Sequence, residues 1–300
     1  MARSRDIPLF HLREYRLPES DLNGFSIETL ASSLLKHPQR SHPHYHHFFQ
    51  VFLVFGKGCM MHDFVEYPFS GPTLGFASPG QVHTVLPVGS LRGSFISFSQ
   101  EFFDGDAPPP SRLLAYPFFF SPDLPPVLPL RDGEISWCKR LFAELQQEYA
   151  AGLPGADEIL RASLRILFAR IARLYPSGPA HHATSRPAQL AYRFRLAVET
   201  HFREMSALSD YAALLKVTPN HLNDVVREET RQSAGEVIRQ RMLLEAKRLL
   251  LHSNLSVSEI GYHLRFKDPS YFARFFRRGT GESPSVFRSG IREKYQTPSP

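Results

Sequence analysis

Apolar residues follow two different spacings along the chain, and the first part has the spacing of strands. Residues 46–55 form a β-branched and aromatic run, which a Gly-Lys-Gly turn at 56–58 ends. Shorter runs of the same kind lie at 73–77, 82–86 and 93–98, separated by Pro, Gly and Ser clusters. Short strands at roughly regular spacing predict an N-terminal antiparallel β-barrel or sandwich.

Helical spacing begins after a proline-rich stretch at 106–130, which we expect to be an extended loop. A first helix is predicted over 135–149 and a second over 158–175, with Gly and Pro between them. The second helix repeats apolar residues at 4-3-4-3 spacing, at Leu160, Leu164, Leu167, Ile171 and Leu174. Such a seam suits packing against the barrel, and it also suits a contact between helices of two copies.

The last third of the chain contains an internal repeat. Residues 176–187 are rich in Pro, Gly and Ser and are typical of an interdomain linker. Beyond this linker the pattern is helical, and residues 211–227 align with residues 260–277, with Asp268 as one extra residue. Two copies of one helical unit are therefore expected.

Each copy has the sequence features of a helix-turn-helix unit. The first helix carries small residues, Ala212 and Ala213 in one copy and Gly261 in the other, which allow a second helix to cross it closely. The second helix begins at a capping residue, Thr218 or Asp268, followed by Pro in its first turn. In a helix-turn-helix unit this second helix enters the major groove of DNA.

A helix predicted over 235–252 joins the two units. Its 18 residues span about 27 Å at a rise of ~1.5 Å per residue. Recognition helices held near one DNA turn apart, about 34 Å, can read successive major grooves on one face of a duplex.

The outward positions of the two recognition helices carry side chains suited to DNA. Asn pairs with adenine, Asp accepts from cytosine, and Arg reads guanine. The predicted base readers are Asn220, His221, Asn223, Asp224, Ser270, Tyr271 and Arg274. The predicted phosphate contacts are Thr218, Arg227, Arg265, Lys267, Arg277 and Arg278.

Positive charge gathers in the same region. The chain has a formal net charge of +6, and residues 187–300 hold 18 Lys and Arg against 12 Asp and Glu. Residues 1–186 hold 17 of each sign. A clustered excess suits a polyanionic partner, although charge alone also fits a solvated basic surface.

Residues 208–290 closely resemble the AraC/XylS family of bacterial transcription regulators. The resemblance is carried by residues 245–250, 257–260, 268–278 and 280–288. It implies two helix-turn-helix units joined by a helix, and it favours an activator of transcription.

Three positions depart from the family pattern. Arg231 and Arg265 stand where the family usually has Gly, and Asp224 stands where a base-contacting Arg often occurs. A non-glycine residue in a left-handed turn costs roughly 1 kcal/mol, so we expect either a slightly reshaped turn or an added phosphate contact from Arg265.

Residues 40–100 resemble the cupin-like effector domain of many AraC regulators. The matching positions are His44, His46, Gln50 and His83, and Gln50 replaces the carboxylate of metal-binding cupins. Three interpretations stay open: histidines lining a small-molecule effector pocket, structural histidines, or a metal site in an enzyme.

The sequence therefore predicts an α+β multidomain protein. A cupin-like antiparallel β-barrel over 1–130 senses an effector, a helical pair over 131–175 is a candidate for dimerisation, and 176–187 form a linker. An all-α domain with two helix-turn-helix units follows over 188–295.

The expected function is sequence-specific transcription regulation, as an effector-responsive activator, with no catalytic residue, metal or cofactor. The expected partners are double-stranded promoter or operator DNA, a small-molecule effector, RNA polymerase and a second copy of the chain. Two alternatives remain: a cupin metalloenzyme fused to a DNA-binding tail, and a constitutive repressor whose barrel serves only dimerisation.

Membrane insertion and secretion are not expected. The chain has no run of 18 apolar residues, and no apolar stretch follows its charged N-terminus. Cys59 and Cys138 lie far apart and lack metal-ligand spacing, which suits a reducing cytoplasm.

Overall fold

The computed structural model describes residues 7–15, 22–106, 112–120, 124–175 and 186–296. The chain divides into two compact units. The boundary between them falls within the predicted linker, between residues 180 and 181. Of that linker only Arg186 and Pro187 are described, and they begin a helix. Among the described residues, no helix is both long and apolar enough to cross a membrane.

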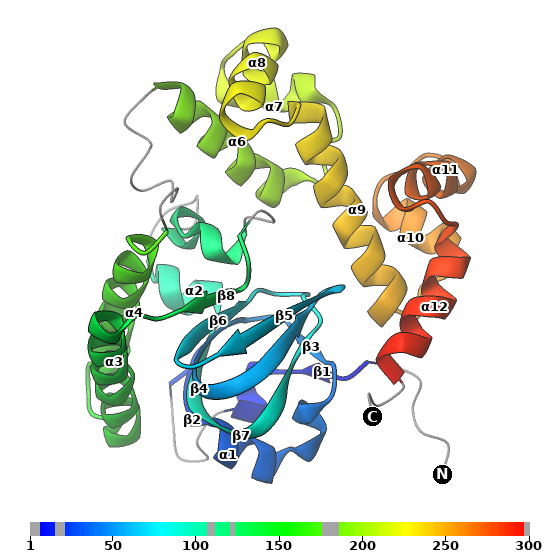
Figure 1. Ribbon diagram of the computed structural model, residues 1–300. Helices are drawn as coiled ribbons and strands as arrows, with labels where there is room; N and C mark the ends of the chain where they lie inside the picture. The colour runs from blue at the N-terminus through cyan, green and yellow to red at the C-terminus, as the bar shows by residue number, and fades with distance from the viewer. Residues whose placement is uncertain (1–6, 16–21, 107–111, 121–123, 176–185, 297–300) are drawn as a thin grey trace. The chain divides into compact units, whose positions relative to one another are not determined.

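The N-terminal unit is built on one antiparallel sheet with the strand order β2-β7-β4-β6-β8, in which β5 also pairs with β4 (Figure 1). Its strands are β2 (Phe25–Thr29), β4 (Phe49–His62), β5 (Val65–Ser70), β6 (Thr73–Ala77), β7 (His83–Phe98) and β8 (Val127–Pro129). A separate parallel ribbon joins β1 (Leu9–Phe10) and β3 (Tyr45–His46).

The sheet bends where β4 and β7 change register between Phe55 and Lys57. Gly56 and Gly93 lie on opposite strands of this bulge with φ of 134° and 157°. A Cβ atom on Gly93 would lie 2.2 Å from the carbonyl oxygen of Leu53, so only glycine allows the strands to pass this closely. The bend lets the first half of β4 pair with β6 and the second half pair with β5.

The predicted antiparallel sheet is confirmed, but a closed barrel is not found among the described strands. The edge strands β2 and β8 pair with β7 and β6 and not with each other. The runs predicted at 82–86 and 93–98 are the two ends of the single strand β7, because Pro87 and Gly89 interrupt the apolar pattern without ending the pairing.

The first half of β4 is buried on both faces, which explains why it reads as a continuous apolar run. Val51 and Leu53 point into one core, which also contains residues from the helices that follow the sheet. Phe52 and Val54 point into a second core, together with Met60. Alternating side chains of one strand therefore fill two different cores.

Two helices, α3 (Asp132–Ala151) and α4 (Ala156–Ala172), cover the first core. Leu160, Leu164, Leu167 and Ile171 of the predicted heptad seam are fully buried there. Of the two interpretations of the seam, packing within the unit is the one that the structure supports. The shorter helices α1 (Leu30–Lys36) and α2 (Gln100–Asp104) begin at Thr29 and Ser99, whose side chains cap them.

The C-terminal unit is all-helical, with two small cores at the two ends of the long helix α9. Figure 1 shows α6 to α8 around one end of α9 and α10 to α12 around the other. The helices are α6 (Arg186–His201), α7 (Leu208–Leu215), α8 (Pro219–Thr230), α9 (Ala234–His252), α10 (Val257–His263), α11 (Pro269–Thr280) and α12 (Pro284–Gln296).

Three turns of this unit hold non-glycine residues in the left-handed region. Lys216, Arg231 and Arg265 have φ of 59°, 63° and 64°. Arg231 and Arg265 therefore keep a left-handed backbone, and the turns are not reshaped to avoid it. In the second unit Gly281 takes the place of Arg231, with φ of 88°.

We predict that Arg231→Gly raises the free energy of unfolding by about 1 kcal/mol, because glycine adopts the left-handed conformation without steric cost. Thermal unfolding followed by circular dichroism measures this change. Arg227→Gly, inside α8, is the matched control and should lower stability by about 1 kcal/mol. Equal destabilisation by both substitutions would show that the turn at Arg231 is not strained.

Candidate nucleic-acid interface

The first helix-turn-helix unit consists of α7, a left-handed turn at Lys216, and α8. Thr218 caps α8, and its side chain accepts a hydrogen bond from the backbone N–H of His221 at 3.3 Å, as the sequence predicts. Leu222 and Val226 bury one face of α8 against Tyr211 of α7. The other face of α8 is therefore available to solvent.

Three of the four base readers predicted on α8 lie on this open face. Asn220, His221 and Asp224 are exposed. Asn223 is half-buried, and its side-chain oxygen accepts a hydrogen bond from the backbone N–H of Ala234 at 3.2 Å. Asn223 thus caps the start of α9, a role that competes with the predicted base contact.

The second unit consists of α10, a turn at Arg265, and α11. Asp268 caps α11 by accepting a hydrogen bond from the backbone N–H of Ser270 at 2.9 Å. Phe272 and Phe276 are fully buried. A Cβ atom on Gly261 would lie 3.2 Å from the Cβ of Phe272, so the small residue predicted in α10 does allow a close helix crossing.

The outward face of α11 carries the predicted contacts of the second unit. Ser270, Tyr271 and Arg274 are exposed, and Tyr271 leaves 58% of its surface open to solvent. The predicted phosphate contacts of this unit are exposed as well: Arg265, Lys267, Arg277 and Arg278. Thr218 and Arg227 of the first unit are also exposed.

The two units differ strongly in charge. Residues 208–230 contain two basic and four acidic side chains, and residues 257–280 contain five basic and two acidic ones. Phosphate neutralisation supplies most of the salt-dependent affinity of a protein for DNA. The charge of the second unit is therefore better suited to the DNA backbone than that of the first unit.

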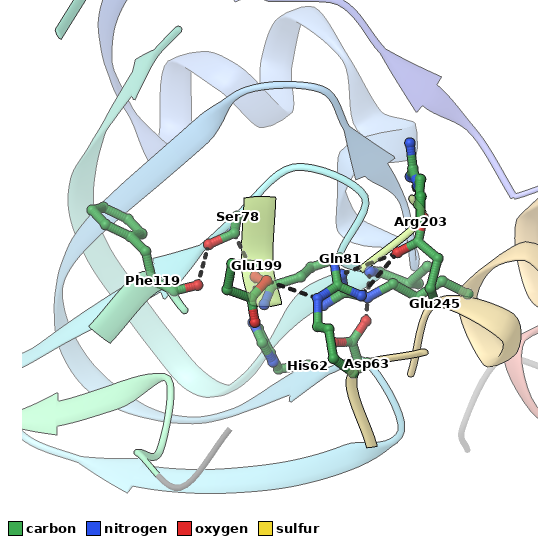
Figure 2. Close-up of polar contacts among 11 residues, drawn as sticks. His62, Asp63, Ser78, Gln81, Phe119, Glu199, Arg203 and Glu245 are labelled. Carbon is green, nitrogen blue, oxygen red and sulfur yellow. Dashed lines mark hydrogen bonds and ion pairs between the residues drawn. The ribbon is translucent and has the colours of Figure 1, made fainter. Parts of the chain in front are cut away.

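A buried ionic cluster fixes α9 to the first unit. Glu245 is buried and pairs with Arg203, with Arg241 (3.2 Å) and with Arg248 (4.0 Å). Arg241 also donates to Glu199 of α6 at 2.7 Å, and Figure 2 labels Glu199, Arg203 and Glu245 of this cluster. Burial raises the pKa of Glu245, but the three guanidinium groups more than offset this and hold it at about 2.

Arginines of α12 fix the other end of α9. Arg292 donates to the carbonyl oxygens of Leu250 and Leu251, at 3.3 and 3.2 Å, and to Ser253 at 2.6 Å. These carbonyls end α9 and have no partner within the helix, so the contacts satisfy them and oppose the helix dipole. The joining helix is thus tied to both reading units, which a helical pattern in the sequence does not reveal.

The histidines predicted to line an effector pocket form a closed, buried network. His44, His46, Gln50 and His83 are all buried. The side-chain oxygen of Gln50 lies 3.0 Å from Nε2 of His46 and 3.2 Å from Nε2 of His83. Its amide nitrogen donates to Ser97 at 2.9 Å.

A small apolar cavity lies elsewhere in the sheet. The cavity inside the curved sheet has a volume of about 10 Å³ and is lined by apolar residues such as Phe52, Met60 and Val127. That volume holds at most about one water molecule. Among the described residues, no group of three or more His, Cys, Asp or Glu side chains is arranged to hold a metal ion.

Burial disfavours charge on all three imidazoles. It lowers the pKa of His44 to about 4 and that of His46 to about 3, the latter with help from neighbouring His44. The pKa of His83 is lowered well below its usual value by burial and by both other imidazoles. The folded state therefore binds fewer protons than the unfolded state as the pH falls below 6.5.

We predict that the N-terminal unit loses stability as the pH falls from about 6.5 to about 4, by up to ~1.4 kcal/mol per pH unit for each histidine. Urea unfolding followed by the fluorescence of Trp137, the single tryptophan, measures this slope. His46→Asn should make the slope shallower by about one proton. Exposed His11→Asn is the control, and equal slopes for both variants would contradict the assignment.

Comparisons with known proteins agree with this interface. A family model described as a helix-turn-helix domain matches residues 211–290. The transcriptional activator RhaS of Escherichia coli O157:H7 is 24% identical over 268 residues, covering 84% of this chain and 90% of RhaS. The transcriptional regulator GlxA of Rhizobium meliloti (strain 1021) is 31% identical over 165 residues, or 52% of this chain and 50% of GlxA.

Similar solved structures include ToxT from Vibrio cholerae O395, which is 13% identical with a TM-score of 0.42 and covers 90% of this chain and 99% of that one. The DNA-binding domain of AdpA in complex with a target DNA is 24% identical with a TM-score of 0.33, over 38% of this chain and 100% of that one. The relatives similar in sequence are transcription regulators rather than enzymes. Residues 211–290 thus match a helix-turn-helix domain, and the chain, which is similar to RhaS and GlxA, is a DNA-binding transcription regulator.

Proposed function

We propose that the protein is an effector-responsive activator that reads a two-part promoter site with α8 and α11. The observation that carries the proposal is the pair of open recognition faces, each backed by a buried core and both tied to one rigid helix. The 19 residues of α9 span about 28 Å, which suits two helices in successive major grooves.

The proposed base contacts are Asn220, His221 and Asp224 in the first groove, and Ser270, Tyr271 and Arg274 in the second. The proposed phosphate contacts are Thr218, Arg227, Arg265, Lys267, Arg277 and Arg278. Further proposed partners are RNA polymerase, which the bound protein recruits, and a second copy of the chain. The proposed location is the cytoplasm, where all of these partners are accessible.

Selection of bound sequences from a random DNA pool, with and without candidate metabolites, tests this function. A two-part consensus sequence is the expected result, with half-sites about one DNA turn apart. Absence of any sequence preference at moderate salt would contradict the proposal.

The filled interior of the sheet favours a second candidate, a constitutive repressor whose sheet unit serves only dimerisation. An effector at His44 and His83 would have to open a closed network. A groove of about 480 Å³, lined by residues that include Asn23, Glu101 and Arg161, offers more room. A screen for small molecules that raise the melting temperature separates the candidates, because a constitutive regulator is stabilised by none.

We predict that Arg274→Ala relaxes preference at one base pair and weakens binding to the selected site by about 1–3 kcal/mol. Arg274 is exposed in the first half of α11, where recognition helices reach base edges. Titration of the selected site and of single-base variants measures the loss. Equal losses on selected and random DNA would refute base reading. Arg140→Ala, at an exposed position on α3, is the control.

We predict that Arg277→Ala weakens binding to all sequences and lowers the slope of log affinity against log salt by about one. Arg277 is exposed in the last turn of α11 and is expected to neutralise one phosphate. Binding measured over a series of salt concentrations gives the slope. An unchanged slope would show that Arg277 does not contact the DNA backbone.

A further inference from the structure

The turn inside each helix-turn-helix unit holds a basic residue in a conformation that favours glycine. Lys216 and Arg265 occupy equivalent positions of the internal repeat, each directly after a buried leucine, Leu215 or Leu264. Their φ of 59° and 64° lies in the left-handed region. A side chain at either position therefore destabilises the turn relative to glycine.

Both turns are closed by the same backbone hydrogen bonds. The backbone N–H of Lys216 donates to the carbonyl oxygen three residues before it, at 3.1 Å, and that of Val217 donates five residues back, at 3.0 Å. In the second unit Arg265 and Phe266 repeat both bonds at 2.9 Å. This pair of bonds is the Schellman motif, whose left-handed position is usually glycine. The turns therefore form without any help from a charged side chain.

The two basic side chains have no compensating contact within the protein. Lys216 and Arg265 are exposed, and neither side chain forms a hydrogen bond or ion pair with another residue in the described part of the chain. Backbone strain without a stabilising contact is typical of positions that have a function. For an exposed cation in a DNA-binding unit, the matching chemistry is a phosphate group.

The position of the turn suits a phosphate contact. The first helix of a helix-turn-helix unit crosses the DNA backbone and the second enters the major groove, so the turn between them lies beside the backbone. The 12 residues of α8 span about 18 Å, whereas the major groove is about 12 Å wide. Lys216 precedes α8, and Arg227 lies in its last turn. A recognition helix oblique to the groove therefore has a cation near each of the two bordering strands.

The cation at the turn matters most in the first unit. Lys216 is one of only two basic side chains among residues 208–230, which also contain four acidic ones. The acidic side chains repel phosphate, so without Lys216 only Arg227 attracts the DNA backbone to this unit.

We propose that Lys216 is a phosphate contact of the first unit, equivalent to Arg265 in the second. Both turns then keep a strained residue because its charge holds a recognition helix on the DNA. The inference rests on the DNA recognition proposed above and adds Lys216, which the sequence analysis did not select. It requires one substitution to have two opposite effects, a more stable fold and weaker DNA binding.

Lys216→Gly in the full chain tests the proposal by calorimetry and by DNA binding over a series of salt concentrations. The melting temperature of the C-terminal unit should rise by about 4 °C, because glycine adopts this turn without strain. Affinity for a duplex of random sequence should fall roughly 3- to 10-fold near 0.1 M salt, and the slope of log affinity against log salt should fall by about one. An unchanged slope overturns the phosphate contact, and an unchanged or lower melting temperature overturns the cost assigned to the turn.

Lys216→Gln separates the charge from the strain. This variant removes the cation but keeps a side chain in the turn, so the salt slope should fall by about one while the melting temperature stays at the parent value. Lys216→Arg keeps the cation and should keep the parent slope. If Lys216→Gln also keeps the parent slope, the loss in Lys216→Gly comes from a changed turn and the proposal is wrong.

Arg231→Gly controls for the loss of a cation from a left-handed turn. Arg231 is exposed with φ of 63°, but its counterpart in the second unit is Gly281, so the repeat places no cation there. This variant should raise the melting temperature as Lys216→Gly does and leave the salt slope unchanged. An equal fall in slope means that the slope follows total charge rather than a contact at Lys216, which overturns the proposal.

The salt slope on random DNA does not depend on sequence preference, so the two proposals can fail separately. If the parent selects no sequence but Lys216→Gly lowers the slope, the phosphate contact stands and the proposed two-part reading fails. If the parent selects a two-part site and Lys216→Gly leaves the slope unchanged, the proposed function stands and the phosphate contact is wrong.

Discussion

The orientation of the first reading unit depends on one buried carboxylate. Glu245 lies in the middle of α9 and is held by Arg203, which follows α6, and by Arg241 and Arg248 of α9 itself. An ionised carboxylate in this position is stable only while its guanidinium partners remain in place, since an unpaired buried charge costs several kcal/mol. The cluster therefore permits little sliding or rotation of α9 against α6, and Arg241 adds a stacking contact 3.8 Å from the Phe202 ring centroid.

The C-terminal end of α9 is held by hydrogen bonds, which fix its position as the ionic cluster does. There the ending carbonyls of the helix accept hydrogen bonds from Arg292 of α12, next to a core of phenylalanines. A carboxylate with its arginines at the middle of α9 and a capped terminus at its end make this helix a rigid spacer. Two recognition helices on a rigid spacer are already positioned relative to each other. The entropy cost of placing the second helix is therefore part of folding and does not reduce the affinity for DNA.

The sequence predicts the C-terminal unit well and the N-terminal unit only in part. Helix starts follow local chemistry, and Thr218 and Asp268 cap the helices they were expected to cap. Contacts between residues far apart in the sequence are harder to predict. Nothing near Asn223 indicates that it caps α9, and Glu245 pairs with Arg203, which lies 42 residues away. Strand closure is also a long-range property, and the alternation within β4 is hidden because both faces of its first half are buried.

The recognition helices divide their positions cleanly between two tasks. Leu222 and Val226, and likewise Phe272 and Phe276, are enclosed by their own unit, whereas Asn220, His221 and Arg274 are exposed. Exchanges at Asn220, His221 or Arg274 therefore leave the packing untouched. Substitutions of exposed residues alone can therefore change which promoters such a protein recognises. Related regulators can then share a fold at low sequence identity and still regulate unrelated genes.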